Sequence, residues 1–327
     1  MFTLRFEGSM KFRIPGASVA ARTEAAALCA AVMAIAAVMT GTAGAQADSS
    51  GAGNSPAPDG KQLVILGDSF TANGWSPFSS EKRCDHGDTA WPAQLSTLMG
   101  LDGTDQVWNQ SCPGAAIEGG DGYTLSVQAS NAAKAGAFGP RTELVTLQFG
   151  FNDRWGGADQ SPWSSAAGCF YEIAGGCGPD AVAEGRMIDP RNITGAEYAA
   201  RISKVVTYVR YYAPAARIVV VGYPELFGSE QHAICFDILG LALEQPKGRT
   251  VVEYFNRMDQ AEREAAAQTQ VEFLDSRALT AGHGLCTPQQ WVNGIFDPLI
   301  KVDGLPFHPA PEGDAVIANA LYERYAR

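Results

Sequence analysis

The sequence predicts a three-layer α/β/α sandwich around a central parallel sheet of five strands. Short apolar segments alternate along the chain with longer segments of helical spacing. The apolar segments are almost continuously hydrophobic, which is typical of strands buried on both faces of a parallel sheet. Alternating strands and helices favour one such sheet with helices packed on both of its faces. We expect this fold in a single domain over residues 61–327.

The expected strands and helices follow one another in a regular order. The strands are residues 62–66, 107–109, 144–149, 217–221 and 271–274, and the helices are residues 90–99, 124–138, 196–212, 250–268 and 312–325. Thr194 and Glu197 have the spacing of a capping box before the third helix, and Pro311 suits the first turn of the last one. Two long segments, 154–192 and 227–248, interrupt the alternation. Loops of this length are usually functional or tied down, so we expect insertions that shape the mouth of a cleft.

Residues 1–45 have the pattern of a cleaved signal peptide. Positive charges precede an apolar run at residues 25–39, and small residues that fit a cleavage site follow it. The run is shorter than the roughly 20 apolar residues of a membrane-spanning helix, so the pattern favours secretion over a stable membrane anchor. Met1 and Met10 are both candidate starts. Residues 46–60 are small, polar and proline-bearing, which predicts a flexible leader.

Charge and cysteine content narrow the possible partners. The formal charge of the chain is -11, and the chain without residues 1–45 is more acidic still. An acidic surface is a poor partner for nucleic acid or for an anionic membrane. An even number of cysteines in an exported chain predicts three disulfides, and the residues alone leave the pairing open. These cysteines are Cys84, Cys112, Cys169, Cys177, Cys235 and Cys286. The sequence contains no Cys-x-x-Cys pair that would favour a zinc site.

Chemically active residues follow the first three expected strands. Ser69 follows the first strand, Gly114 the second and Asn152 the third. Ligands of parallel sheets bind outside the carboxyl ends of the strands, so these residues should meet at one edge. A serine becomes a nucleophile beside a base, and the oxyanion that its attack creates needs fixed donors. The backbone N–H groups of Ser69 and Gly114 and the Asn152 amide would supply those donors, which predicts acyl transfer.

Four histidines are candidates for the base, namely His86, His232, His283 and His308. We favour His308 because it lies just before the last helix, where the chain can return to the carboxyl edge of the sheet. His86 is the second candidate. With Asp85 and Asp88 it would also form the one candidate metal site, but such a run more often makes a solvated turn. We therefore expect neither a metal nor a cofactor.

Four blocks carry a family resemblance in their order along the chain. Gly67-Asp68-Ser69, the glycine of NQSCPGA, the GFND at 150–153 and the late His308-Pro309 resemble the successive blocks of SGNH (GDSL) hydrolases, and the cysteines resemble their secreted actinobacterial esterase and lipase branch. The resemblance implies a flavodoxin-like fold and a carboxylic-ester hydrolase. It implies Ser69 as nucleophile and first oxyanion donor, Gly114 and Asn152 as further donors, and His308 as base. It also implies the disulfides Cys84–Cys112, Cys169–Cys177 and Cys235–Cys286.

The sequence departs from that family at the group that orients the histidine. The family usually has an aspartate three residues before the catalytic histidine, and Leu305 occupies that position here. Some members of the branch use a main-chain carbonyl instead. We therefore expect the Leu305 carbonyl to accept a hydrogen bond from Nδ1 of His308, with Asp303 as the alternative. Asp68 and Asp153 are expected to cap turns or helix starts.

The substrate is the least determined part of the prediction. Five apolar residues near the expected cleft indicate a pocket for an acyl chain, and each of them is also a candidate core residue. They are Trp75, Phe78, Phe151, Trp155 and Phe307. Lipid, small carboxylic and sugar esters all fit these residues. The alternatives are a carbohydrate O-deacetylase on the same fold, or an inactive carbohydrate-binding surface protein in which Trp155 and Trp163 stack on sugars. Ser69 lacks a Gly-x-Ser-x-Gly context, which argues against an α/β-hydrolase. We expect a monomer that acts on a small-molecule or lipid ester.

Overall fold

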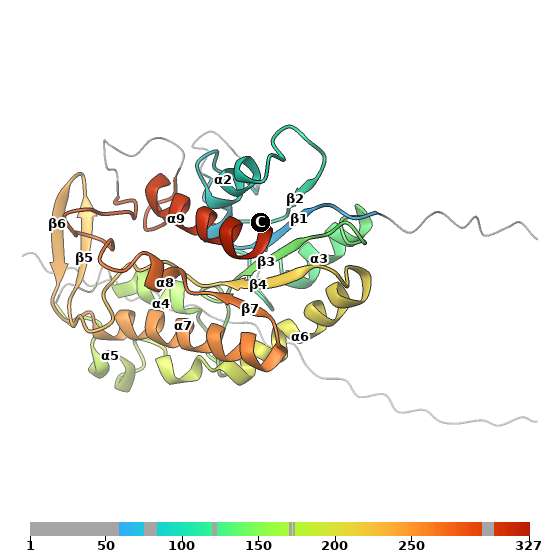
Figure 1. The fold of residues 1–327 in the computed structure, drawn as a ribbon. Helices are drawn as coiled ribbons and strands as arrows, with labels where there is room; N and C mark the ends of the chain where they lie inside the picture. The colour runs from blue at the N-terminus through green and yellow to red at the C-terminus, as the bar shows by residue number, and fades with distance from the viewer. Residues whose placement is uncertain (1–58, 75–83, 120–122, 170–171, 173, 296–303) are drawn as a thin grey trace, which may run out of the picture. The chain divides into compact units, whose positions relative to one another are not determined.

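A parallel sheet of five strands forms the centre of the fold, in the order β2-β1-β3-β4-β7 (Figure 1). The strands are β1 (Leu63–Gly67), β2 (Val107–Asn109), β3 (Leu144–Gln148), β4 (Arg217–Val221) and β7 (Glu272–Leu274). This computed structural model describes residues 59–74, 84–119, 123–169, 172, 174–295 and 304–327. The α/β fold predicted from the sequence is confirmed. The expected signal peptide 1–45 and residues 46–58 of the expected leader lie outside the described residues.

Helices cover both faces of this sheet. They are α2 (Trp91–Leu98), α3 (Leu125–Lys134), α6 (Gly195–Tyr212), α7 (Arg249–Thr269) and α9 (Pro311–Leu321). Leu63 and Ile65 of β1 belong to an apolar cluster with residues of α2 and α9. Val64 and Leu66 belong to a second cluster, with residues of α3, α6 and α7. Because successive strand residues point to opposite faces, the two clusters are the two sides of a three-layer core.

Local sequence signals explain where several helices begin. The Thr194 side chain accepts a hydrogen bond from Glu197 N at 3.3 Å and caps α6, which is one half of the predicted capping box. The Glu197 carboxylate accepts from Gly156 N and Arg201 instead. Pro311 occupies the first turn of α9, where its missing N–H costs nothing. The described part of the chain also contains the short helices α1 (Ser69–Ala72) and α8 (Ser276–Leu279) and the terminal π-helical turn η2 (Tyr322–Ala326).

The two expected insertions contain secondary structure of their own. The first contains α4 (Pro162–Cys169), α5 (Pro179–Ala183) and the 3-10 turn η1 (Pro190–Asn192). The second contains an antiparallel hairpin, β5 (Ile234–Ile238) and β6 (Leu241–Gln245), which was not predicted from the sequence. The hairpin is a sheet separate from the five-stranded one, and Figure 1 shows it at the left of the view.

Three disulfides fasten the loops around the sheet. They join Cys84 to Cys112, Cys169 to Cys177 and Cys235 to Cys286. This is the pairing that the family resemblance implied. The first joins the segment after α1 to the loop after β2, the second closes the insertion around α4, and the third fixes the hairpin to the loop after α8. Each such bond typically stabilises a protein by roughly 2–4 kcal/mol.

Candidate active site

The candidate nucleophile Ser69 is the first residue of α1, which begins where β1 ends. The preceding Asp68 is completely buried and caps this helix, because its Oδ1 accepts a hydrogen bond from Phe70 N at 2.9 Å. The hydroxyl of Tyr223, beyond β4, donates to Oδ2 of the same carboxylate at 2.5 Å. Asp68 thus has the capping role expected from the sequence. It fixes the short helix and its partly exposed serine at the carboxyl edge of the sheet.

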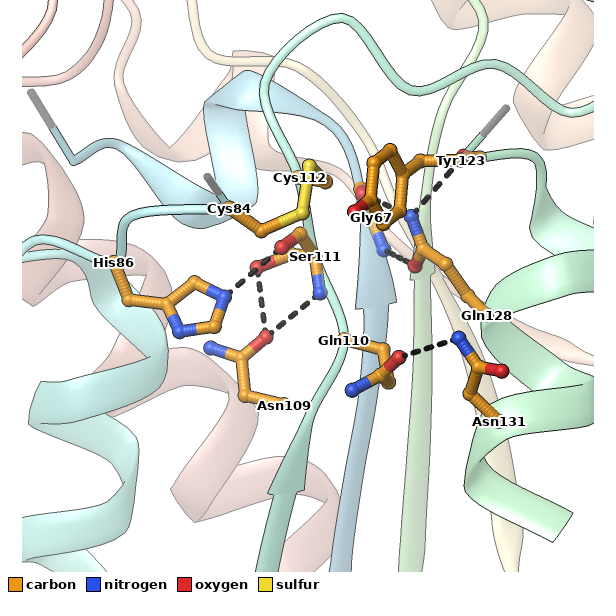
Figure 2. The surroundings of a disulfide bond; sticks show 10 residues. All are labelled: Gly67, Cys84, His86, Asn109, Gln110, Ser111, Cys112, Tyr123, Gln128 and Asn131. Atoms are coloured by element: carbon orange, nitrogen blue, oxygen red, sulfur yellow. Dashed lines mark hydrogen bonds between the residues drawn. A yellow bond between two sulfur atoms is a disulfide. The ribbon is translucent and has the colours of Figure 1, made fainter. Parts of the chain in front are cut away.

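The turn between β1 and α1 is tightly packed. A Cβ on Gly67 would lie 2.1 Å from Oγ1 of Thr71, so a larger residue does not fit there. The Gln128 side chain of α3 accepts from Gly67 N and donates to Gly67 O, both at 2.9 Å (Figure 2). These contacts pair the backbone N–H of Gly67 and give its carbonyl a hydrogen bond from a side chain at the end of the strand.

The expected oxyanion donors lie on two adjoining loops. Asn152, after β3, donates from Nδ2 to the carbonyl of Ala115 at 2.9 Å, which sets its amide beside Gly114. Gly114 is exposed with φ of 79°, and a Cβ built on it meets nothing within 4 Å, so a ligand can approach its backbone closely. Cys112 N donates to Gly67 O at 3.0 Å and joins this loop to the nucleophile turn.

Asp153 holds the loop that follows Gly114. Its carboxylate accepts hydrogen bonds from the backbone N–H groups of Ile117 at 2.8 Å and Glu118 at 2.9 Å. Arg201 of α6 forms an ion pair with the same carboxylate at 3.1 Å. Burial raises the pKa of Asp153 to about 6, while its hydrogen bonds and Arg201 oppose that rise. Asp153 therefore tethers a loop, as its position in the sequence predicted.

His308 is buried at the start of the segment that leads into α9. Its Nδ1 lies 2.8 Å from the carbonyl oxygen of Pro306. This corrects the expectation of Leu305, whose carbonyl accepts from the backbone N–H of His308 at 3.2 Å instead. The reason is the backbone at Phe307, which has φ of 64° and turns the chain so that the Pro306 carbonyl faces the ring. Asp303, the alternative, lies outside the described residues.

The hydrogen bond to Pro306 has a consequence for the protonation state of His308. A carbonyl can only accept, so Nδ1 carries the proton and Nε2 keeps a free lone pair. Within the described part of the chain, buried Nε2 has no hydrogen-bond partner. Burial lowers the pKa of His308 from 6.5 to about 4, and the bond to Pro306 only partly opposes this. At neutral pH the imidazole is therefore uncharged and able to accept a proton.

Asn73 joins the nucleophile helix to the histidine segment, a role that was not predicted from the sequence. It ends α1 with φ of 37°. Its Nδ2 donates to Pro309 O at 2.9 Å and to Oδ2 of Asp314 at 2.8 Å. Its Oδ1 accepts from Leu305 N at 3.1 Å. An asparagine at a helix C-terminus is common, so no local pattern indicated this wider role.

A ring contact joins the same two segments. The centroid of the Phe70 ring, on α1, lies 4.2 Å from that of His308. Phe70 is buried, so this contact adds apolar packing to the hydrogen bonds of Asn73. The nucleophile helix and the histidine are therefore held together by both kinds of interaction.

The other three histidine candidates have different surroundings. His232 is exposed in the second insertion, where its carbonyl accepts a hydrogen bond from Gly248 N. Nε2 of His86 lies 2.9 Å from the carbonyl of Ser111, beside the Cys84–Cys112 disulfide (Figure 2). His283 stacks on Trp291, and its Nδ1 lies 2.7 Å from Gln289 O. Among the residues that the structure describes, no group of three or more His, Cys, Asp or Glu side chains could hold a metal ion.

An apolar cavity of about 660 Å³ lies near His308, and neither His308 nor Ser69 is among its lining residues. Phe307 lines it, and so does half-buried Trp163, whose ring centroid is 5.5 Å from that of His308. Further walls come from both insertions and from α7, including Phe227, Phe236, Leu243 and Phe255. A cavity of this size and polarity is typical of a site for a small organic ligand.

Only some of the residues that were expected to form an acyl pocket line this cavity. Phe307 lines the cavity as predicted. Phe151 packs on Phe255 within the core, at a centroid distance of 4.4 Å, and does not line the cavity. Trp155 is 0% exposed, stacks on Tyr198 and donates to Gly150 O, so its interpretation as a pocket wall or a sugar platform was wrong. Trp75 and Phe78 lie outside the described residues.

None of the helices that the structure describes is long and apolar enough to cross a membrane.

The sequence of this chain matches a known family and a relative from Streptomyces. Residues 65–316 match the model of the GDSL-like Lipase/Acylhydrolase family. The chain is similar to Lipase 2 of Streptomyces coelicolor, with 28% identity over 263 residues that cover 78% of this chain and 83% of that protein.

Two crystal structures have the same fold. The extracellular lipase of Streptomyces rimosus superposes with a TM-score of 0.53 and 19% identity, over 80% of this chain and 99% of that one. Phospholipase A1 of Streptomyces albidoflavus superposes with a TM-score of 0.52 and 20% identity, over 79% and 98% of the two chains.

Proposed function

This chain belongs to the GDSL-like lipase/acylhydrolase family and is a hydrolase of ester bonds, and on that premise we propose that it is a secreted carboxylic-ester hydrolase that acts through an acyl-enzyme on Ser69. The observation that carries this proposal is the neutral, buried imidazole of His308 on a segment fastened to the nucleophile helix. Its Nδ1 proton is directed to the Pro306 carbonyl, so Nε2 is the atom that takes the serine proton.

The reaction follows from this arrangement. Nε2 of His308 accepts the hydroxyl proton while Oγ of Ser69 attacks the ester carbonyl carbon. The oxyanion accepts hydrogen bonds from the N–H groups of Ser69 and Gly114 and from the Asn152 amide, which has a second N–H besides the one on Ala115 O. The Ser69 N–H belongs to the first turn of α1 and has no acceptor within that helix. Collapse of the intermediate expels the alcohol, which takes the proton from His308, and water then releases the acid by the same steps in reverse.

Pro306 takes the orienting role in this mechanism. A carbonyl oxygen fixes the tautomer and the orientation of the ring, but it stabilises the imidazolium less than a carboxylate does. The buried ring therefore remains a weak base, and the proton moves on to the leaving alcohol readily.

The cavity beside His308 supports a lipid ester as substrate. It is lined mainly by aromatic and aliphatic side chains, which accept an acyl chain and offer few partners for the hydroxyl groups of a sugar. The burial of Trp155 removes one of the two platforms on which the carbohydrate-binding alternative rested. The names of the similar proteins, a lipase and a phospholipase A1, point in the same direction.

Secretion is supported by independent features. Three disulfides are typical of proteins that fold outside the reducing cytosol. A structural relative is an extracellular lipase, and residues 1–45 have the pattern of a signal peptide. The acidic charge of the chain fits no role with nucleic acid.

The test is hydrolysis of p-nitrophenyl esters, from acetyl to palmitoyl, by the disulfide-bonded protein and its Ser69→Ala variant. We expect turnover to vanish in Ser69→Ala and to be greatest with medium or long acyl chains. Ser203→Ala, on α6, is the matched control and should keep full turnover. A fluorophosphonate should label the wild type and Ser203→Ala, and it should not label Ser69→Ala. Folded wild-type protein that neither labels nor hydrolyses any of these esters would refute the proposal.

A further inference from the structure

The hairpin β5–β6 exposes large apolar side chains although it lies in an acidic protein. Leu239, Leu241 and Leu243 are 60%, 68% and 51% exposed, respectively. They come from one short stretch of chain, at the turn and along β6. Single exposed leucines need no explanation, but Leu241 and Leu243 share one face of β6 and Leu239 lies in the turn beside them. Exposed apolar residues gathered in this way mark an interaction site.

The register of the hairpin continues this surface into the cavity beside His308. Phe236 is paired with Leu243, and Ile238 with Leu241, so these four side chains share one face. Phe236, Ile238 and Leu243 line the cavity. Exposure along this face rises from 7% at Phe236 to 68% at Leu241. The wall of the cavity, which Glu244 and Gln245 also line, therefore continues along Ile238 and Leu243 toward the exposed tip of the hairpin.

The turn itself keeps a leucine where the backbone disfavours one. The hairpin has a two-residue turn, Leu239-Gly240, and both residues have positive φ, 56° and 77°. Asparagine or glycine is the usual first residue of such a turn, and a bulky residue is an outlier there. Leu239 is largely exposed and gains no burial in return. The strain is therefore not balanced by burial within the described chain, which points to an external contact for this side chain.

From these observations we infer that the tip of the hairpin, Leu239 and Leu241, inserts into the surface of a zwitterionic phospholipid layer and brings the mouth of the cavity onto it. This inference rests on the proposed function, because it supplies the route by which an acyl chain enters the cavity from a lipid aggregate. Leu243 lies between the tip and the cavity and completes that route.

Charge and shape decide between lipid and the other possible occupants. The opposite face of the hairpin carries Asp237 and Glu244, and the whole chain has a charge of -11, so anionic lipids are repelled and zwitterionic ones are not. A stable dimer buries about 800 Å² of each partner, which a two-residue turn with one flanking leucine does not supply. A protruding apolar tip suits shallow insertion into lipid instead.

The experiment uses the Ser69→Ala protein, which leaves the lipid intact, and vesicles of phosphatidylcholine. Co-sedimentation should detect binding, and the further changes Leu239→Asn and Leu241→Thr together should weaken it by at least about tenfold. Both replacements suit their backbone positions, so the hairpin should still form. Tyr211→Ser, which removes a 77% exposed aromatic from α6, is the matched control and should bind like the parent.

A second measurement locates the contact directly. Addition of vesicles should blue-shift the tryptophan fluorescence of the Leu241→Trp protein more than that of the parent. Brominated phosphatidylcholine should quench this added fluorescence. Equal vesicle binding by the parent and the double variant would overturn the inference. A parent that is dimeric in solution and becomes monomeric in the double variant would also overturn it, because the leucines would then form a contact between two copies.

Activity separates this inference from the proposed function. With Ser69 restored, the double variant should hydrolyse a soluble short-chain ester at the wild-type rate and lose activity only on vesicles. If wild-type protein hydrolysed no ester at all while its vesicle binding still depended on the two leucines, the lipid contact would stand and the proposed reaction would fall. Loss of soluble-ester hydrolysis in the folded double variant would count against the lipid contact as the role of the tip.

Discussion

At the carboxyl edge of the sheet, buried polar side chains hold one another in place, whereas the hairpin β5–β6 carries some of its most apolar side chains into solvent. Asp68 is bound by Tyr223, and Asn73 is bound to Asp314. The connections of the hairpin to the rest of the chain include the disulfide of Cys235, backbone hydrogen bonds to Ile295, and the hydrogen bond that Gln245 donates to Glu172 O at 3.0 Å.

The difference fits the roles that we propose for the two regions. Atoms that take part in bond formation must be held within a fraction of an ångström, and satisfied buried networks provide that rigidity. A surface that meets a fluid lipid layer needs apolar area rather than fixed geometry. Substitutions at the sheet edge should therefore cost activity and stability together. Those at the hairpin tip should cost neither in solution.

Among variants that keep Ser69 and His308, Asn152→Ala should lose the most turnover. Removing one oxyanion donor should lower kcat by roughly 10²–10³-fold and leave KM nearly unchanged, because the amide bonds the charge that develops in the transition state. Steady-state kinetics on a soluble ester measures both constants. Asn319→Ala, an exposed position on α9, is the control. A rise in KM with unchanged kcat would show that Asn152 binds the ground state instead.

The pH profile of kcat/KM should reflect the burial of His308. The base that we propose, His308, acts in its neutral form, and burial lowers its pKa from 6.5 to about 4. Activity should therefore hold from neutral pH down to about pH 5 and fall only as the pH passes through about 4. With the ordinary pKa it would already be roughly 30-fold lower at pH 5.

Asp68 is the control for this profile, because burial raises its pKa to about 7 and it too titrates in this range. Asp68→Asn keeps a good helix cap and removes that titration. Asp153, whose pKa is raised to about 6, titrates in the same range, so an acid limb near pH 6.5 that persists in both Asp68→Asn and Asp153→Asn would contradict the low pKa of His308.

Asn73→Gly tests the fastening between α1 and the histidine segment. Glycine accepts the positive φ of this position, so the change removes the side-chain hydrogen bonds without adding backbone strain. We expect a loss of about 2–4 kcal/mol in unfolding free energy and a roughly tenfold lower kcat with little change in KM. Denaturant unfolding and ester kinetics measure the two.

The matched control for Asn73 is Asn131→Ala, which removes a side-chain hydrogen bond from α3 to Gln110. It should lower stability slightly and leave kcat unchanged. A folded Asn73→Gly protein with wild-type kcat and fluorophosphonate labelling rate would show that the fastening serves stability alone.

The sheet and the candidate residues could be predicted because they depend on short-range signals. Apolar runs identify strands, and Ser69, Gly114 and Asn152 closely follow strand ends, where topology alone brings them to one edge. His308 was favoured by its place before the last helix.

What could not be predicted depends on backbone angles and on distant pairs. The choice of the Pro306 carbonyl over that of Leu305 is made by the φ of Phe307. The contact of Asn73 with Asp314 spans 241 positions and has no local pattern. The hairpin was missed because Leu-Gly is not a usual two-residue turn.

The single change Leu239→Asn in that unusual turn should have the smallest effect of these variants, and its sign tests the contrast most directly. Asparagine tolerates φ of 56° far better than leucine, so the unfolding free energy should rise by about 1 kcal/mol. Hydrolysis of a soluble ester should not change, because Leu239 does not line the cavity. Denaturant midpoints of the wild type and the variant provide the measurement. If Leu239→Asn destabilised the protein instead, the leucine would be making a stabilising contact within the chain. Its exposure would then need no external partner, and the contrast between the hairpin and the sheet edge would disappear.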